Sequence, residues 1–296
     1  MVIVEHAYAK LNLTLEVIRK RTDGYHDLAT ILQTVDLHDT LEFRDNEGIE
    51  FECSDASIAD DDNLVVRSSE ALRKVAGTGR GAHISLQKRI PVAAGLGGGS
   101  ADAAATLRGL NRLWELGLSE NELVEIATEV GSDVPFLICG GTALASGRGE
   151  KLERLPAPEH GWFVIVAPRD VGDDGSGLNK TARMFGMLTS TAHTTGSLTR
   201  KLAARMIEKG DCHPAFMFNV FQQVAPHAFP NWQKIHDGFA GLGASDIVLT
   251  GAGPSMFAVA PSKEVATAWA LLTKARMGCE AFAVGLAPRI EIDPEQ

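Results

Sequence analysis

The feature that most constrains the fold is a glycine-rich stretch, PVAAGLGGGSADAAA, at residues 91–105. Gly95 and Gly97 to Gly99 lack a Cβ atom, so the backbone can take positive φ angles and bring its N–H groups close to an anion. A run of helix formers follows, and Ser100 stands where an N-cap belongs. The helix dipole would then point its positive end at the glycines. With a strand expected at 82–88, the pattern predicts a strand, a phosphate-binding loop and a helix.

Two common phosphate motifs do not fit this stretch. No lysine follows the glycines as it does in a Walker loop. A dinucleotide-binding turn would need an acidic residue at a strand end about 20 residues later, whereas Glu115 and Glu120 fall in or beside the following helix. On these residues alone, a tight turn without a ligand stays open as the alternative.

Length and composition limit the architecture and the class of function. The 296 residues, 45% of them hydrophobic, suffice for two domains with a buried interior. The proline-rich segment 155–161 is the best linker, so we place the domains at 1–154 and 155–296. A net charge of −10 argues against a nucleic-acid surface.

The four cysteines lie far apart, which argues against a zinc site or a disulfide framework and indicates reduced thiols. The first residues do not resemble a secretion signal, and no uncharged run fits a membrane span. We therefore expect a cytoplasmic protein without a membrane or nucleic-acid partner.

For two residues outside the glycine-rich stretch, the sequence allows both a structural and a functional interpretation. Residues 2–9 and 11–18 predict a pair of strands, and Lys10 between them is either an edge charge or a cation directed into a site. Residues 40–53 predict a β-hairpin. Asp133, two residues before Pro135, is either a helix N-cap or a partly desolvated carboxylate of a site.

Tyr25 and His26 leave a polar turn together. They could grip a heterocycle, or they could belong to an ordinary surface turn.

Three segments together resemble the GHMP kinase superfamily: AYAKLNLTLEVIRKRTDGYHDL, the glycine-rich stretch and LTGAGPSMFAVA. Within it, the combination of KLNL, RTDGYH and GSDVPF is similar to the kinases of 4-diphosphocytidyl-2-C-methyl-D-erythritol. The resemblance covers residues 7–287. It implies an α/β fold of the α+β type, with a mixed-sheet N-terminal nucleotide-binding domain and a ferredoxin-like C-terminal domain.

The resemblance also implies roles for individual residues. Lys10 and Asp133 fall at catalytic positions. The implied ATP-binding residues are Asn63, Lys88, Pro91, Val92, Ala93, Ala94, Gly95, Leu96, Gly97, Gly98, Gly99, Ser100 and Ala101. The implied acceptor-binding residues are Asn12, Tyr25, His26, Thr181 and Phe185. A third glycine loop holds Gly251, Gly253 and Ser255.

The implied reaction is ATP-dependent phosphorylation of the 2-hydroxyl of a small cytidylated polyol, in non-mevalonate isoprenoid synthesis. Mg²⁺ is expected with ATP, but the sequence identifies no metal ligands. We expect a monomer or a weak homodimer. The alternatives are a GHMP kinase of the homoserine or mevalonate type, and a nucleotide-binding module without turnover.

The chain also departs from the family pattern. It has Ala93 and Ala94 where glycines are common, Pro254 in the third glycine loop, no acidic residue after Asn219, and a long acidic segment at 170–180.

Overall fold

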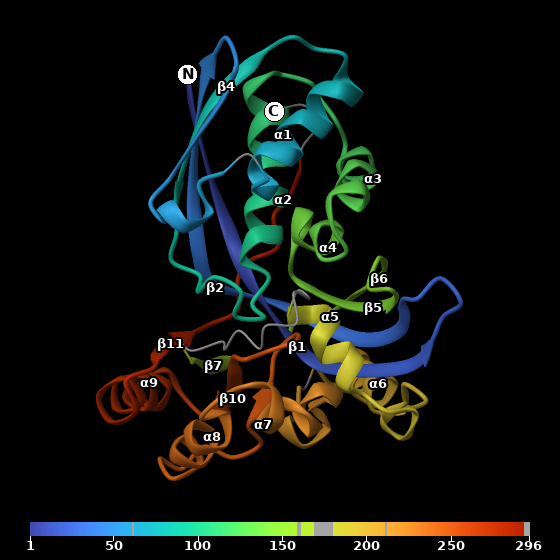
Figure 1. Cartoon of the computed structure of the whole chain (residues 1–296), viewed down its shortest axis with the longest axis vertical. Helices are drawn as coiled ribbons and strands as arrows, with labels where there is room; N and C mark the ends of the chain where they lie inside the picture. The colour runs from blue at the N-terminus through green and yellow to red at the C-terminus, as the bar shows by residue number, and fades with distance from the viewer. Residues whose placement is uncertain (61, 159–160, 169–179, 211, 293–296) are drawn as a thin grey trace.

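The computed structural model describes residues 1–60, 62–158, 161–168, 180–210 and 212–292. They form a mixed α/β fold built on two sheets (Figure 1). The strands of the first sheet are β1 (Val2–Lys20), β2 (His26–Asn46), β3 (Ile49–Cys53), β4 (Gly81–Gln87), β5 (Thr142–Gly147), β6 (Lys151–Leu155) and β8 (Phe218–Asn219). Those of the second are β7 (Trp162–Ala167), β9 (Val248–Leu249), β10 (Met256–Ala260) and β11 (Glu280–Val284).

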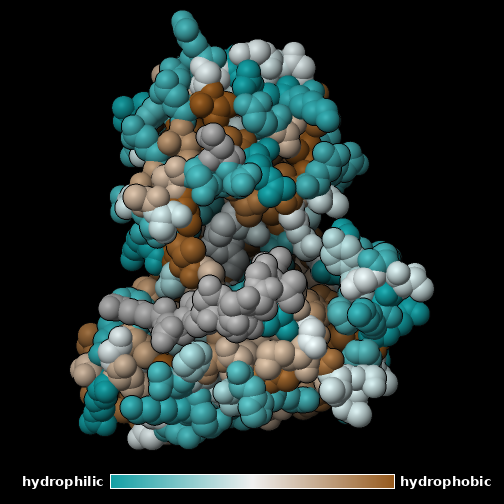
Figure 2. All heavy atoms as spheres, viewed as in Figure 1, coloured by the Kyte–Doolittle hydropathy of each residue, from teal (hydrophilic) through white to brown (hydrophobic). Residues whose placement is uncertain are grey.

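Helices cover both sheets (Figure 1). Those beside the first sheet are α1 (Leu64–Ala76), α2 (Gly98–Leu113), α3 (Glu120–Val130) and α4 (Val134–Cys139). Later in the chain come α5 (Lys180–Met187), α6 (Ser197–Lys209), α7 (Ala225–Ala228), α8 (Trp232–Ala240) and α9 (Lys263–Met277). Figure 2 shows hydrophilic side chains over most of the lower edge of one face, with hydrophobic ones nearer the middle of the molecule.

The opening segment forms one long strand, so the predicted pair of strands at 2–9 and 11–18 is wrong. β1 runs through Lys10 and pairs antiparallel with β2. A reversal at Lys10 would need turn residues such as Asn-Gly, which the sequence lacks there. The register instead shifts between Tyr8 and Lys10 and between Asn12 and Thr14. Such bulges redirect side chains without ending a strand.

The predicted hairpin at 40–53 is also wrong. β4 lies between β2 and β3, antiparallel to β2 and parallel to β3. The turn after β2 receives the start of β4, where the Ala82 N–H donates to the Gly48 carbonyl at 2.9 Å. Alternating residues identified both strands correctly, but a local pattern cannot reveal that a later strand inserts between them.

Close packing of α2 against the first sheet sets the position of the glycine-rich loop. The helix is buried along most of its length, and its alanines allow a short distance to the sheet. At Gly109 an ideal Cβ would lie 2.4 Å from Cε2 of Phe43. A larger residue at Gly109 would therefore push α2, and the loop at its start, away from β2.

Ser100 is not the N-cap of α2. The helix begins at Gly98, and its N-cap is Gly97, with a left-handed φ of 73°. Glycine takes this conformation without a Cβ penalty, so the helix starts earlier than a serine cap would allow. Gly98, Gly99 and Ser100 therefore form the first turn, whose N–H groups have no partner inside a helix.

The second sheet has the order β11-β7-β10-β9, antiparallel throughout. Numbered along the chain, this order is 4-1-3-2, and helices follow the first and third strands. This is the ferredoxin-like arrangement expected for the C-terminal half.

The proposed boundary at 154/155 stays a prediction, and contacts between the two halves cross it. β8 pairs parallel with β1, and the Ile290 N–H donates to the Cys139 carbonyl at 2.8 Å.

Candidate active site

Lys10 and Asp133, far apart in the sequence, lie side by side. Nζ of Lys10 is 3.3 Å from Oδ2 of Asp133. The lysine side chain is only 5% exposed, whereas the aspartate side chain is 38% exposed. The pair therefore combines a fixed ammonium with a carboxylate that a ligand can reach.

Asp133 holds the N-cap position of α4, but its side chain makes no capping hydrogen bond to that helix. Its φ of −88° and ψ of −16° are close to helical values, whereas a side-chain cap usually needs an extended residue. The carboxylate therefore serves the contact with Lys10 rather than the helix terminus.

A chain of hydrogen bonds fixes the Lys10 ammonium from behind. Nζ donates to Oδ1 of Asn12 at 2.7 Å, and Nδ2 of Asn12 donates to Oγ1 of Thr30 at 2.9 Å. Because the amide nitrogen is taken by Thr30, the amide oxygen must face the lysine. The network holds the ammonium in one place before any ligand arrives.

The glycine loop, residues 95–99, closes over Lys10. The Lys10 N–H donates to the Leu96 carbonyl at 2.9 Å. At Gly97 an ideal Cβ would lie 2.9 Å from Cγ of Lys10. Any side chain at Gly97 would thus move either the loop or the lysine.

The third glycine loop, residues 250–255, packs directly on the first. The Ser255 N–H donates to the Ala94 carbonyl at 3.1 Å. An ideal Cβ at Gly95 would lie 2.4 Å from the Thr250 carbonyl oxygen, so only glycine allows this approach. Oγ1 of Thr250 also accepts a hydrogen bond from the Asn12 N–H at 3.1 Å. Hydrogen bonds therefore join both loops to β1.

Asn219 supports the third glycine loop. Its Nδ2 donates to the carbonyls of Leu249 and Gly251, at 2.7 and 2.9 Å. The asparagine therefore has a structural role that does not depend on an acidic residue after it.

The remaining residues of the glycine-rich stretch differ in burial. Ala94, Leu96 and Ala101 are buried, Pro91, Gly95, Gly97, Gly98 and Ser100 are half-buried, and Val92, Ala93 and Gly99 are exposed. Ser255 is fully buried, and its hydroxyl has no hydrogen-bond partner among the residues described.

On the expected acceptor side, the structure brings together His26 and Phe185. Their rings stack with centroids 4.6 Å apart and planes 13° from parallel. Burial, with Lys20 and His193 nearby, lowers the pKa of His26 below its ordinary 6.5. The ring is therefore neutral at neutral pH and can both donate and accept a hydrogen bond.

Tyr25 and Thr181 are not part of that stack. Tyr25 is 55% exposed, and the Arg148 guanidinium lies 4.6 Å from its ring centroid. Thr181 is exposed in the first turn of α5.

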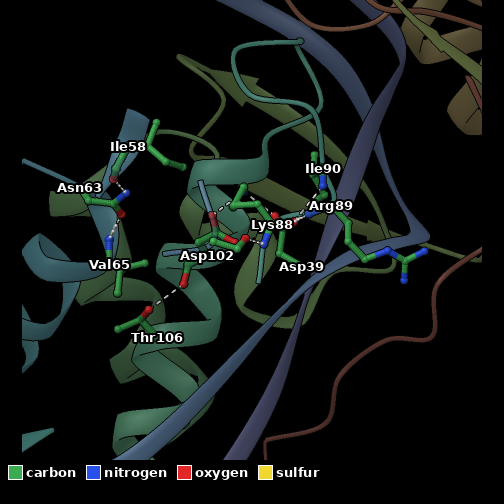
Figure 3. A network of polar contacts seen from close by, with 10 residues as sticks. Asp39, Ile58, Asn63, Val65, Lys88, Arg89, Ile90, Asp102 and Thr106 are labelled. Carbon is green, nitrogen blue, oxygen red and sulfur yellow. Dashed lines mark hydrogen bonds and ion pairs between the residues drawn. The ribbon is translucent and has the colours of Figure 1, made fainter. Parts of the chain in front are cut away.

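Lys88 lies in a closed ionic cluster, which we call the Lys88 cluster: Lys88, Asp39 and Asp102. Nζ of Lys88 is 2.5 Å from Oδ2 of Asp39 and 2.7 Å from Oδ2 of Asp102. Oδ1 of Asp39 also accepts the Ile90 N–H at 2.8 Å. Figure 3 shows the three side chains pointing toward one another at the start of α2, while the Arg89 side chain points away.

Burial would lower the pKa of Lys88, but the neighbouring Asp102 and Asp39 outweigh it and raise that pKa. Burial raises the pKa of Asp102 to about 7, because Lys88 offsets only part of the desolvation. The Lys88 cluster thus contains its own counter-charges.

Asn63 caps α1. Its Oδ1 accepts the Val65 N–H at 2.9 Å, and its Nδ2 donates to the Ile58 carbonyl at 2.7 Å (Figure 3). The next residue, Leu64, has its Cδ1 3.6 Å from an ideal Cβ at Gly99. Asn63 therefore lies near the first turn of α2.

The sequence reasoning missed Lys180, the first residue of α5. Its Nζ donates to the Ala93 carbonyl at 2.6 Å and to the Gly253 carbonyl. A lysine at a helix start looks like a surface charge, and the only signal was its place directly before Thr181. The acidic segment before it, at 170–179, lies outside the described residues.

Comparison with known proteins identifies the family to which the chain belongs. The family model for the GHMP kinases N terminal domain matches residues 63–141. The 4-diphosphocytidyl-2-C-methyl-D-erythritol kinase of Pelotomaculum thermopropionicum is 42% identical over 276 residues, which cover 90% of this chain and 92% of the relative. The chain belongs to the 4-diphosphocytidyl-2-C-methyl-D-erythritol kinase family. The corresponding kinase of Enterococcus faecalis is 39% identical, with 89% and 92% covered.

Solved structures confirm the expected fold. A crystal structure of 4-(cytidine 5'-diphospho)-2C-methyl-D-erythritol kinase superposes with a TM-score of 0.77 at 28% identity, and covers 96% of this chain and 99% of the other. A homoserine kinase from Cytophaga hutchinsonii has a TM-score of 0.76 at 18% identity, over 98% and 96% of the two chains. The latter similarity shows the fold alone, because GHMP kinases with different acceptors share one architecture.

Proposed function

We propose that this chain is an ATP-dependent kinase that phosphorylates the 2-hydroxyl of 4-diphosphocytidyl-2-C-methyl-D-erythritol, a step of non-mevalonate isoprenoid synthesis. The observation that carries the proposal is the contact between Lys10 and Asp133 beside the glycine loop, in a chain of this family.

Asp133 is the general base in this mechanism. Its exposed carboxylate accepts the proton of the acceptor hydroxyl as the oxygen attacks the γ-phosphorus. The bond from that phosphorus to the β-phosphate oxygen breaks, and ADP leaves. A carboxylate suits this role because it needs only to accept a proton at the moment of attack.

Lys10 and the glycine loop provide charge stabilisation. Phosphoryl transfer has little covalent chemistry for the protein to perform, so catalysis depends on positioning and on electrostatic complementarity. The N–H groups in the first turn of α2 suit phosphate oxygens, and the fixed Lys10 ammonium suits the charge that is transferred. Because Asn12 and Leu96 already hold Lys10, little reorganisation is needed during the reaction.

Mg²⁺ would enter with ATP and neutralise phosphate charge. Among the described residues, no group of three or more His, Cys, Asp or Glu side chains could hold a metal ion. Asp133 supplies a hard oxygen donor beside Lys10, which fits an ion held mainly by phosphates and water.

The acceptor specificity rests on the stacked pair of His26 and Phe185. An aromatic wall beside a neutral imidazole suits a pyrimidine ring, which can stack and exchange hydrogen bonds. Homoserine and mevalonate carry no ring, so this pair favours a cytidylated acceptor over either of them.

In the described part of the chain, no helix is both long and hydrophobic enough to span a membrane. The cytoplasmic location, the monomeric or weakly dimeric state and the absence of a nucleic-acid partner stay predictions from composition.

An acceptor screen tests the proposal. The purified chain is incubated with ATP, Mg²⁺ and one acceptor at a time: the cytidylated methylerythritol, free methylerythritol, homoserine or mevalonate. We expect ADP release with the cytidylated acceptor alone. The proposal would be rejected if homoserine or mevalonate gave ADP at a similar rate. It would also be rejected if none of the four acceptors led to ADP release.

A further inference from the structure

Lys180 joins the two glycine loops. Its ammonium donates to the carbonyl of Ala93, just before the glycine loop, and to that of Gly253, in the third glycine loop. Ala93 is itself held at a left-handed φ of 53°. The ammonium therefore lies where the two loops meet, and a phosphate bound by either loop would be close to it.

The charges around Lys180 differ from those around Lys88. Lys88 has two carboxylates within 2.7 Å, whereas no carboxylate among the described residues forms an ion pair with Lys180. In the part of the chain that the structure describes, the charged groups that act on Lys180 are Lys10, from β1, and Arg183, from α5. Burial and these two cations lower the pKa of Lys180 to about 8. Among the described residues, the acceptors of this ammonium are the two backbone carbonyls, which carry only partial negative charge.

We propose that Lys180 is a phosphate-binding residue, whose ammonium contacts a phosphoryl group held between the glycine loop and the third glycine loop. The inference rests on the proposed function, which supplies two sources of that chemistry: the phosphates of ATP and the diphosphate of the cytidylated acceptor.

The position of α5 is compatible with either source. The helix starts at Lys180, beside the loops, and five residues later it carries Phe185, which stacks on His26. One short helix thus connects the phosphate region with the ring-binding pair. An anion at Lys180 would complete the interactions at the start of this helix.

The competing explanation is that Lys180 only links the two glycine loops and binds no phosphate. The protonation state of Lys180 distinguishes the two explanations. A neutral amine can still donate to two carbonyls, so a purely structural link does not require the charged ammonium. A contact with phosphate favours the charged form. Phosphate binding should therefore raise the pKa of Lys180 and draw a proton from solution above pH 8.

The experiment is calorimetric titration of the full chain at pH 8.5, in two buffers of different ionisation enthalpy, with ADP and Mg²⁺ in one arm and CDP in the other. With a pKa of about 8, roughly three quarters of a proton should be taken up per bound ligand. Lys180→Arg should bind with similar affinity and without this uptake. Lys180→Met should bind about 10- to 100-fold more weakly, since it loses a charge-assisted hydrogen bond.

Lys74→Met, at an exposed lysine of α1, is the matched control and should behave as the parent chain. Uptake in the ADP arm assigns the contact to ATP, and uptake in the CDP arm assigns it to the acceptor. Equal proton uptake by the parent chain and Lys180→Arg, in both arms, would overturn the proposal even if Lys180→Met failed to fold. Failure of phosphoryl transfer to the cytidylated acceptor would instead reject the proposed function and leave the ADP result standing.

Discussion

The Lys88 cluster and the Lys10–Asp133 pair both place a lysine and aspartate beside the glycine loop. The first is closed to ligands, and the second is accessible to them. An ideal Cβ at Gly98 would lie 3.4 Å from Nζ of Lys88, and one at Gly97 would lie 2.9 Å from Cγ of Lys10. Each lysine therefore contacts the loop closely.

The difference lies in how the positive charge is compensated. The two carboxylates of the Lys88 cluster are buried, with side chains at most 3% exposed. The Asp133 carboxylate, which pairs with Lys10, is 38% exposed. A buried cation enclosed by buried carboxylates supports the fold, whereas a pair with an accessible carboxylate can meet a ligand.

The largest effect should come from removing the proposed base. Asp133→Asn should lower kcat by about 10²- to 10⁴-fold, the usual contribution of a positioned general base. The free energy of unfolding should change little, because the side chain is partly exposed and does not cap α4. Glu129→Gln, at an exposed position of α3, is the control. A near-normal kcat for Asp133→Asn would remove the residue from the mechanism.

Lys88→Met should show the reverse pattern. It leaves Asp39 and Asp102 buried without a cation, which should lower the free energy of unfolding by about 3–5 kcal/mol in urea titrations. Lys74→Met should change it by less than about 0.5 kcal/mol. An unchanged stability combined with weaker ATP binding would instead support the role in nucleotide binding that the resemblance implied for Lys88.

Gly97→Ala should disturb both stability and activity. The left-handed φ of 73° costs an alanine about 1–2 kcal/mol, and the new methyl group would press on the Lys10 stem. Gly77→Ala is a matched control, because Gly77 has a φ of 60° with no described atom within 4 Å of an ideal Cβ. We expect similar losses of stability and a lower kcat for Gly97→Ala alone. Equal kcat values would show that the loop does not position Lys10.

Asp102→Asn should alter the pH dependence of stability. The unfolded carboxyl ionises near pH 3.8 and the folded one near pH 7, so the native state binds more protons between those values. This group's contribution to stability is therefore complete at low pH and is lost as pH rises toward 7.

The Asp102→Asn variant lacks the ionisable group, so its stability does not fall with rising pH for this reason. The stability difference between the parent chain and the variant should shift in favour of the variant by about 1 kcal/mol or more from pH 4.5 to 8. Urea unfolding at several pH values measures it. A difference that is constant with pH would mean that Asp102 ionises normally.

Local signals in the sequence predicted much of the fold. One such signal is the capping box of Ser119 and Glu122 at the start of α3, whose partners are only three residues apart. Gly77 ends α1 in the left-handed conformation. The error at Ser100 arose because glycine and serine both suit an N-cap, and only the backbone angle at Gly97 distinguishes them.

Contacts between residues far apart in the sequence were harder to predict. The insertion of β4 between β2 and β3 leaves no local trace, so residues 40–53 looked like a hairpin. The residues alone left Lys10 and Asp133 with two readings each, and only the resemblance to a family joined them. Lys180 was missed because its partners are backbone carbonyls, which no residue type reveals.

A double-mutant cycle on Lys10 and Asp133 tests the central claim most directly. The rate of phosphoryl transfer from ATP to the cytidylated acceptor would be measured for Lys10→Met, for Asp133→Asn and for the double variant. If the two side chains act as one unit, the double variant should be about as slow as the slower single variant. Losses that multiply in the double variant, or single variants with near-normal rates, would contradict the account.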